Sequence, residues 1–160
     1  MSIKTTLNEV LVRLFRNINT IEEQAVKHGS FKDLTVNDMH VMEAIGIGFP
    51  QTMSTVAKSL MVTTGTLTIA VNGLVKKGYV DRVRSEEDRR VGLVSLADKG
   101  RKAFRDHQRF HEDMVTAIIS GLSPDEQKIL EKSLGNLSKF FYDRVVSNES
   151  KSEGPQSKKN

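Results

Sequence analysis

Small and polar side chains share one face of the segment from Thr64 to Lys76. Leu67, Val71 and Leu74 are three and four residues apart, so this segment is predicted to be a helix that packs these residues inward. Thr and Asn can hydrogen-bond to base edges, and small side chains allow close approach to a major groove. An ordinary solvated face would carry similar residues. The candidate DNA-reading residues of this segment are Thr63, Thr64, Gly65, Thr66, Thr68, Ile69, Asn72 and Lys76.

Four arginines follow in a segment with two short runs of β-branched residues, 79–84 and 91–96. The runs predict a β-hairpin with a polar tip, whose basic side chains could reach phosphates and the minor groove. The tip also contains acidic residues, and a mixture of positive and negative charges is typical of an ordinary solvated turn. A helix-turn-helix followed by a basic hairpin is nevertheless the winged-helix arrangement, which favours DNA binding. The candidate residues here are Arg82, Arg84, Asp88, Arg89 and Arg90.

Two of the four histidines, His107 and His111, are four residues apart on a predicted helix and so share a face. With His40 and Glu22 or Glu23 they could form a zinc site of nitrogen and oxygen ligands. Alternatively, they line the polar mouth of a pocket or make core hydrogen bonds. Nearby Met and Phe residues favour a pocket for an apolar effector, although such residues are more often plain core. The predicted effector residues are Phe31, Met39, His40, Met42, Phe104, His107, Phe110 and His111, with no metal and no cofactor.

Composition narrows the class of protein. The chain has 160 residues, 38% hydrophobic and 28% charged, which is typical of one soluble globular domain with extensions. The lack of cysteine excludes disulfides, thiol nucleophiles and Cys-containing zinc sites. Without a Gly-rich phosphate loop, a nucleophile elbow or an acid pair, an enzyme is not expected. We expect a cytoplasmic protein with no membrane segment or signal peptide, and its net charge of +4 permits a polyanionic partner.

Helices position most of these residues. Apolar periodicity, Ser and Thr caps and Gly ends predict six helices, with the hairpin between the fourth and fifth. The predicted fold is mainly α with a small β-hairpin wing, in the order α-α-α-α-β-β-α-α: a winged helix-turn-helix with a helical dimerisation region. The helices are expected within residues 7–29, 35–46, 52–60, 63–78, 98–121 and 123–141.

Apolar stripes on the first and last helices predict self-association, because one small core cannot cover them and two-fold pairing buries the same stripe twice. We therefore expect a homodimer that binds a double-stranded operator with inverted half-sites about 34 Å apart. Residues 1–34 would form an N-terminal dimerisation helix, 35–96 a winged helix-turn-helix DNA-binding domain and 97–146 the C-terminal dimerisation helices. Residues 147–160 lack large apolar side chains and are predicted to form a disordered tail.

The wing resembles that of the MarR-type transcriptional regulators. The resemblance rests on the runs 78–82, 88–96 and 99–100, and on the wing pattern Asp-x-Arg, three residues, an aliphatic residue, any residue, Leu and Thr. Ala97 stands in place of that Thr, so Asp98 is expected to cap the next helix. By element order the resemblance covers residues 1 to about 146. It implies a homodimer built from the first, fifth and sixth helices, with Asp88 bracing the wing and Arg90 reaching DNA.

Several runs are also similar to the branch of this family that represses fatty-acid-synthesis genes in streptococci, lactococci and enterococci. This similarity implies an effector, a long acyl chain on acyl carrier protein, that increases operator affinity. Acyl carrier proteins are acidic, and five basic residues against one acid in residues 99–109 would suit such a partner or flank DNA. The similar runs are 31–33, 39–40, 60–63, 82–86, 88–91 and 109–111.

Other functions stay open at this point. A zinc-responsive regulator of the MarR type would use the histidines as ligands. An enzyme has little support in the sequence. A nucleoid protein would bind DNA without a preferred site, which a comparison of specific with non-specific competitor DNA would detect.

Overall fold

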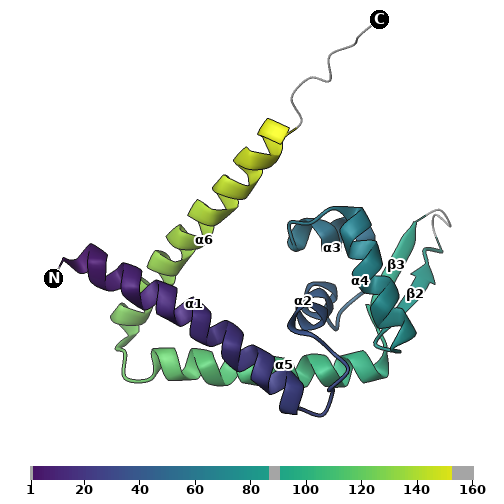
Figure 1. Ribbon diagram of the computed structural model, residues 1–160, viewed down its shortest axis with the longest axis horizontal. Coiled ribbons are helices and arrows are strands. Elements are labelled where there is room, and N and C mark those ends of the chain that lie inside the picture. Colours follow the sequence, from purple (N-terminus) through teal and green to yellow (C-terminus); the bar gives the residue numbers. More distant parts are fainter. Residues whose placement is uncertain (1, 87–90, 153–160) are drawn as a thin grey trace, which may run out of the picture. The chain divides into compact units, whose positions relative to one another are not determined.

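The computed structural model describes residues 2–86 and 91–152 (Figure 1). The predicted fold is confirmed, and one short strand, β1, was not foreseen because two residues are too few to show a pattern. The chain divides into two compact units, Met1–Phe110 and His111–Asn160, which are described separately. In chain order the elements are α1 (Ile3–His28), α2 (Val36–Ile45), β1 (Gln51–Thr52), α3 (Met53–Ser59), α4 (Thr64–Lys76), β2 (Val80–Arg84), β3 (Gly92–Leu96), α5 (Asp98–Ile119) and α6 (Pro124–Ser152).

Threonine side chains cap the starts of α2, α3 and α4 in the first unit. Thr35 forms a reciprocal capping box at the start of α2, and Thr52 and Thr63 cap α3 and α4, as predicted. The expectation that Asp98 caps α5 was wrong. Asp98 is the first residue inside α5, so Ala97 holds the cap position and the acid instead lies in the first turn, where it favours the helix dipole.

The core of the first unit gathers α2, α3 and α4 against one face of the sheet. Leu67, Val71 and Leu74 of α4 are almost fully buried, which confirms the predicted inward face of that helix. The three strands are antiparallel in the order β1-β3-β2, with Val80 paired to Leu96. In Figure 1 the β2–β3 hairpin extends beside α4. The predicted tip residues Asp88, Arg89 and Arg90 lie outside the described residues.

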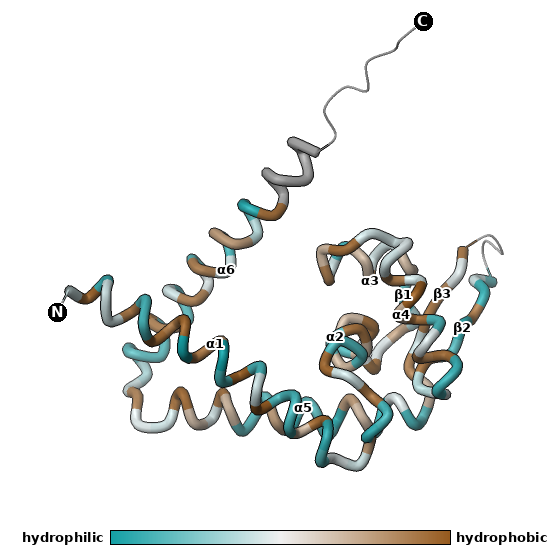
Figure 2. The backbone as a smooth tube through the Cα atoms, viewed as in Figure 1, coloured by the Kyte–Doolittle hydropathy of each residue, from teal (hydrophilic) through white to brown (hydrophobic). Residues whose placement is uncertain are grey.

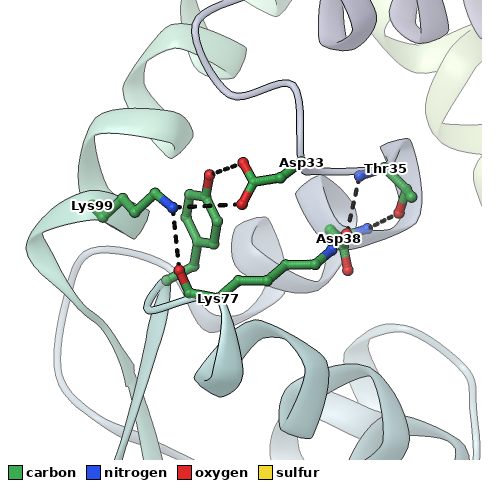
Figure 3. Close-up of polar contacts among 6 residues, drawn as sticks. Asp33, Thr35, Asp38, Lys77 and Lys99 are labelled. Atoms are coloured by element: carbon green, nitrogen blue, oxygen red, sulfur yellow. Dashed lines mark hydrogen bonds and ion pairs between the residues drawn. The ribbon is translucent and has the colours of Figure 1, made fainter.

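Polar contacts join the end of α4 to α2 and to the start of α5 (Figure 3). Lys77 Nζ pairs with Asp38 Oδ2 at 2.9 Å. The buried Tyr79 donates its hydroxyl to Asp33 Oδ1 at 2.5 Å, and Lys99 Nζ lies 4.0 Å from the centre of the Tyr79 ring. These contacts hold the exit of α4 and the first residues of the wing in one position relative to the loop after α1.

Gly100 allows α5 to pass directly over the backbone at Tyr79. A Cβ atom added at Gly100 would overlap the carbonyl oxygen of Tyr79, which already accepts a hydrogen bond from Ala97 N at 3.0 Å. No side chain fits at this crossing without moving one of the two backbones. The Gly100 crossing therefore sets where α5 leaves the wing.

The second unit consists of the end of α5 and α6. Ser123 and Glu126 form the predicted helix start, with Ser123 N donating to Glu126 Oε2 at 2.8 Å. The α6 helix continues to Ser152, beyond the predicted start of the tail, because extending an existing helix needs no new nucleus. Residues 153–160 of the predicted tail lie outside the described part of the chain.

Apolar side chains remain exposed on the long terminal helices. Figure 2 shows hydrophobic residues recurring between hydrophilic ones along α1. On α1, Leu7, Val10 and Phe15 are about half exposed, and on α6 so are Phe140 and Phe141. Within residues 2–86 and 91–152, no helix combines the length and apolar character needed to cross a bilayer.

Candidate nucleic-acid interface and effector pocket

The outer face of α4 carries small and polar residues in the exposed positions that the sequence predicted. Ile69 is 76% exposed, Asn72 and Lys76 are exposed, and Thr68 is half-buried. Thr64, Gly65 and Thr66 are exposed in the first turn. This face is therefore open to a macromolecular partner, whereas the opposite face lies in the core.

Hydrogen bonds within α4 determine what its threonines can offer to a partner. Thr63 Oγ1 accepts from Thr66 N at 3.1 Å and lies 2.9 Å from Thr66 Oγ1. Both hydroxyls therefore already make hydrogen bonds at the N-terminal cap of α4. Thr68 Oγ1 donates to Thr64 O at 2.7 Å. With its proton so placed, Thr68 presents a methyl group and acceptor lone pairs, which suit a thymine methyl or a base amino group.

The wing strand β2 adds basic side chains next to this face. Arg82 and Arg84 are exposed on β2. The guanidinium of Arg82 donates from Nη2 to Asn72 Oδ1 at 2.7 Å, which links the wing to α4. This hydrogen bond fixes the Arg82 cation beside the outer face of α4.

A small cavity lies between the end of α1, α2 and the first part of α5. Four predicted effector residues line it, namely Phe31, Met39, His107 and Phe110. Its volume is about 80 Å³, and the rest of its wall is Ala25, Val26, Gly29, Ser30 and Asp106, which the sequence reading missed. A cavity between packed helices depends on tertiary packing, which the local sequence pattern does not encode.

The other predicted effector residues do not line this cavity. Met42 is fully buried in the core, and Phe104 packs against the same core. His40 lies in a separate groove between α2 and the α3–α4 turn. His111 is half-buried, one turn beyond His107 on α5 and at the start of the second unit.

Carboxylates and imidazoles meet beside the cavity. Glu22 is only 3% exposed, and its carboxylate oxygens lie 3.8 Å from His40 Nε2 and 4.0 Å from His107 Nε2. His107 Nε2 is also 3.4 Å from Glu43 Oε1. One ligand atom each of His40, Glu43 and His107 lies within 4.8 Å of the others, a spacing that could hold a metal ion. The sequence reading missed Glu43, although it follows His40 by one turn of the same helix.

Two pKa shifts accompany the contact between Tyr79 and Asp33. The hydrogen bond from Tyr79 lowers the pKa of the Asp33 carboxyl, and the nearby Lys99 cation acts in the same direction. Burial, followed by the hydrogen bond to Asp33, raises the pKa of the Tyr79 hydroxyl. At neutral pH the pair is therefore a neutral phenol donating to a carboxylate, which is a charge-assisted and strong form of hydrogen bond.

A small-residue helix on a helix-turn-helix core, with an arginine-bearing two-stranded wing beside it, defines a winged-helix DNA-binding protein. The MarR family model matches residues 32–91. With the relatives described next, this match shows that the chain belongs to the MarR family of transcriptional regulators. It is thus a DNA-binding regulator of transcription and not an enzyme.

Solved and curated relatives support this assignment over most of the chain. The Streptococcus pneumoniae protein FabT, solved in complex with DNA, is 44% identical, with 88% of this chain and 98% of that chain covered and a TM-score of 0.80. The regulator BldR of Sulfolobus solfataricus is 25% identical over 87% of this chain and 99% of its own, with a TM-score of 0.62. The Bacillus subtilis regulator MhqR is 27% identical over 84% of this chain and 93% of its own.

Proposed function

We propose that this MarR-family regulator is a repressor of fatty-acid-synthesis genes whose operator affinity is increased by long acyl chains on acyl carrier protein. The observation that carries the proposal is the 44% identity to Streptococcus pneumoniae FabT, a protein solved on DNA, over 88% of the chain. It agrees with the similarity of six sequence runs to the fatty-acid branch of the family. A DNA target would place the regulator in the cytoplasm.

The α4 face and the wing would bind the operator. Thr68 and Asn72 would contact base edges, while Arg82, Arg84 and Arg90 would neutralise phosphates at the side. Losing one base contact is expected to reduce discrimination by about 1–3 kcal/mol, whereas losing one phosphate contact should weaken binding to all DNA and lower the salt slope by about one. Comparing Thr68→Ala with Arg84→Ala on operator and random DNA tests this division.

The acyl chain would enter the cavity lined by Phe31, Met39 and Phe110. At about 80 Å³ this cavity is smaller than the roughly 300–1,000 Å³ of ordinary ligand sites, so a long chain requires it to widen. Val26 lines both the cavity and a neighbouring groove of about 420 Å³. Displacing the Val26 side chain would join the two spaces. The acyl chain would then bind the conformation with the joined space more tightly than the conformation with the small cavity, and this difference would shift the equilibrium between them.

The acidic carrier protein would meet a basic surface at the start of α5. Arg101 Nε donates to Leu96 O at 3.1 Å, and Lys99 contacts Asp33 and Lys77, so these two cations already serve the fold. Lys102 and Arg105 are exposed and would carry the docking interaction. Their removal should weaken the acyl response at low salt more than at high salt.

An operator titration with and without long-chain acyl carrier protein tests the effector claim. Ser30 is exposed at the mouth of the cavity, so Ser30→Trp should block entry without disturbing the core, whereas Ser30→Ala should leave the response intact. We expect the acyl carrier to tighten operator binding about 5- to 150-fold, the usual range of coupling between sites. An operator affinity that is the same with and without the acylated carrier protein would contradict the proposed acyl effector.

A zinc-responsive regulator is a second candidate, favoured by the cluster of Glu22, His40, Glu43 and His107. Imidazole and carboxylate are suitable zinc ligands, and ligand atoms of His40, Glu43 and His107 that lie within 4.8 Å of one another are spaced as a metal site needs. The same titration with zinc and then with chelator separates the candidates. Zinc-dependent operator binding that His107→Ala and Glu43→Gln both abolish would establish this function in place of the acyl response.

Self-association would complete the DNA-binding unit, because one chain offers one α4. The half-exposed apolar residues of α1 and of α6 would be buried in a two-fold homodimer. Such a dimer would present its two α4 faces to an operator of two inverted half-sites about 34 Å apart.

A further inference from the structure

The hydrogen bond between Arg82 and Asn72 determines which atoms of the Asn72 amide face outward. A guanidinium carries only donors, so the amide atom 2.7 Å from Arg82 Nη2 must be the carbonyl oxygen. The amide NH2 group of Asn72 is then turned away from the wing. Because both side chains are exposed, this orientation belongs to the surface that meets a partner and not to the core.

An asparagine with a free amide reads adenine by using both of its edges. Its oxygen accepts from the adenine N6 amino group while its NH2 donates to N7. Arg82 occupies one of the two lone pairs of Asn72 Oδ1 and fixes the rotation of the amide, so the N–H donors are the edge that Asn72 turns away from the wing. Guanine presents two adjacent acceptors, N7 and O6, whereas the N6 amino group of adenine would meet a donor.

We propose that Arg82 is a specificity-determining positioning residue, which turns Asn72 into a hydrogen-bond donor that selects guanine over adenine at the base it faces. The proposal rests on the proposed reading of DNA by α4. It assigns Arg82 a role beyond phosphate neutralisation, and it makes the wing part of the base-reading surface through a single side-chain contact.

The test is selection of preferred sites from a randomised DNA library by the full-length protein. Wild type should enrich guanine at one base pair of each half-site, and Asn72→Ala should lose that preference. Arg82→Ala frees the amide to rotate, so the preference at this base pair should shift toward adenine by about tenfold. Equal thermal unfolding curves would show that these exposed substitutions leave the fold unchanged.

Two controls distinguish the positioning of Asn72 by Arg82 from the general attraction of a cation to DNA. Arg84→Ala removes a cation from the same strand and should weaken binding without shifting any base. In the Asn72→Ala background, Arg82→Ala should change affinity and salt slope but no base preference. If Arg82→Ala behaves like Arg84→Ala in the wild-type background, or if the base lost in Asn72→Ala is not guanine, the proposal is overturned. A wild type that enriches no sequence would instead refute site-specific DNA binding itself.

Discussion

At the scale of single residues, the bond between Tyr79 and Asp33 connects segments 46 positions apart in the sequence. Removing the hydroxyl with Tyr79→Phe should lower the free energy of unfolding by about 1.5–3 kcal/mol at neutral pH, the usual net value of a hydrogen bond to a charged group. Asp33 has a lowered pKa, so its contribution is present above about pH 4 and is lost as pH falls further. Tyr79 has a raised pKa, so the contribution also falls as pH rises above about 10.

Urea unfolding of wild type and Tyr79→Phe at several pH values checks this prediction. The difference between the two proteins should be largest near pH 7 and should shrink toward pH 3. A difference that stays constant over this range would mean that Asp33 is not the partner that matters.

Gly100 offers a second residue-scale prediction, because the backbone of Tyr79 lies where its Cβ would be. Alanine normally stabilises a helix relative to glycine by about 0.5–1 kcal/mol. Gly100→Ala should instead destabilise by about 1–3 kcal/mol through overpacking. A methyl group added at Gly135 in α6 would meet open space, so Gly135→Ala is the matched control and should stabilise. Thermal melts that move in the same direction for both variants would contradict the close crossing.

At the scale of elements, α5 begins without a polar cap, since Ala97 occupies the cap position. Ala97→Thr should stabilise the protein by about 1 kcal/mol if its hydroxyl accepts from the first turn. Ala97→Val has the same shape without the hydroxyl and is the control. Denaturant titration should rank threonine above valine, and equal midpoints would show that no capping bond forms.

The sequence predicted well those elements whose formation depends on residues close together in the chain. The helices follow from apolar spacing and from caps such as Thr35 and Ser123, because period and capping act within a few residues. The strand β1 has too few residues to show the alternation of apolar and polar residues that marks a strand. The bond of Arg82 to Asn72 and the meeting of Glu43 with His107 depend on how elements pack, and no local pattern encodes them. The outward face of α4 was predictable because its opposite face is apolar.

At the scale of the whole molecule, the half-exposed apolar side chains of α1 and α6 predict a stable homodimer at micromolar concentration. Leu14→Lys should produce monomer or unfolded chain, because a desolvated and unpaired charge costs several kcal/mol. Sedimentation velocity measures the outcome directly. Lys4→Ala on the same helix removes no apolar contact and should remain dimeric, whereas a folded wild-type monomer would exclude the two-fold arrangement.

The most direct measurement for the central claim is an operator titration in excess non-specific competitor DNA. The probe carries an inverted repeat chosen from the site selection, and the comparison probe has one half-site shifted by half a helical turn. A two-fold regulator should bind the intact repeat at least about 10³-fold more tightly than random DNA and should lose most of that preference on the shifted probe. Equal affinity for the intact repeat, the shifted probe and random DNA would contradict a site-specific regulator and would indicate a protein that coats DNA without reading it.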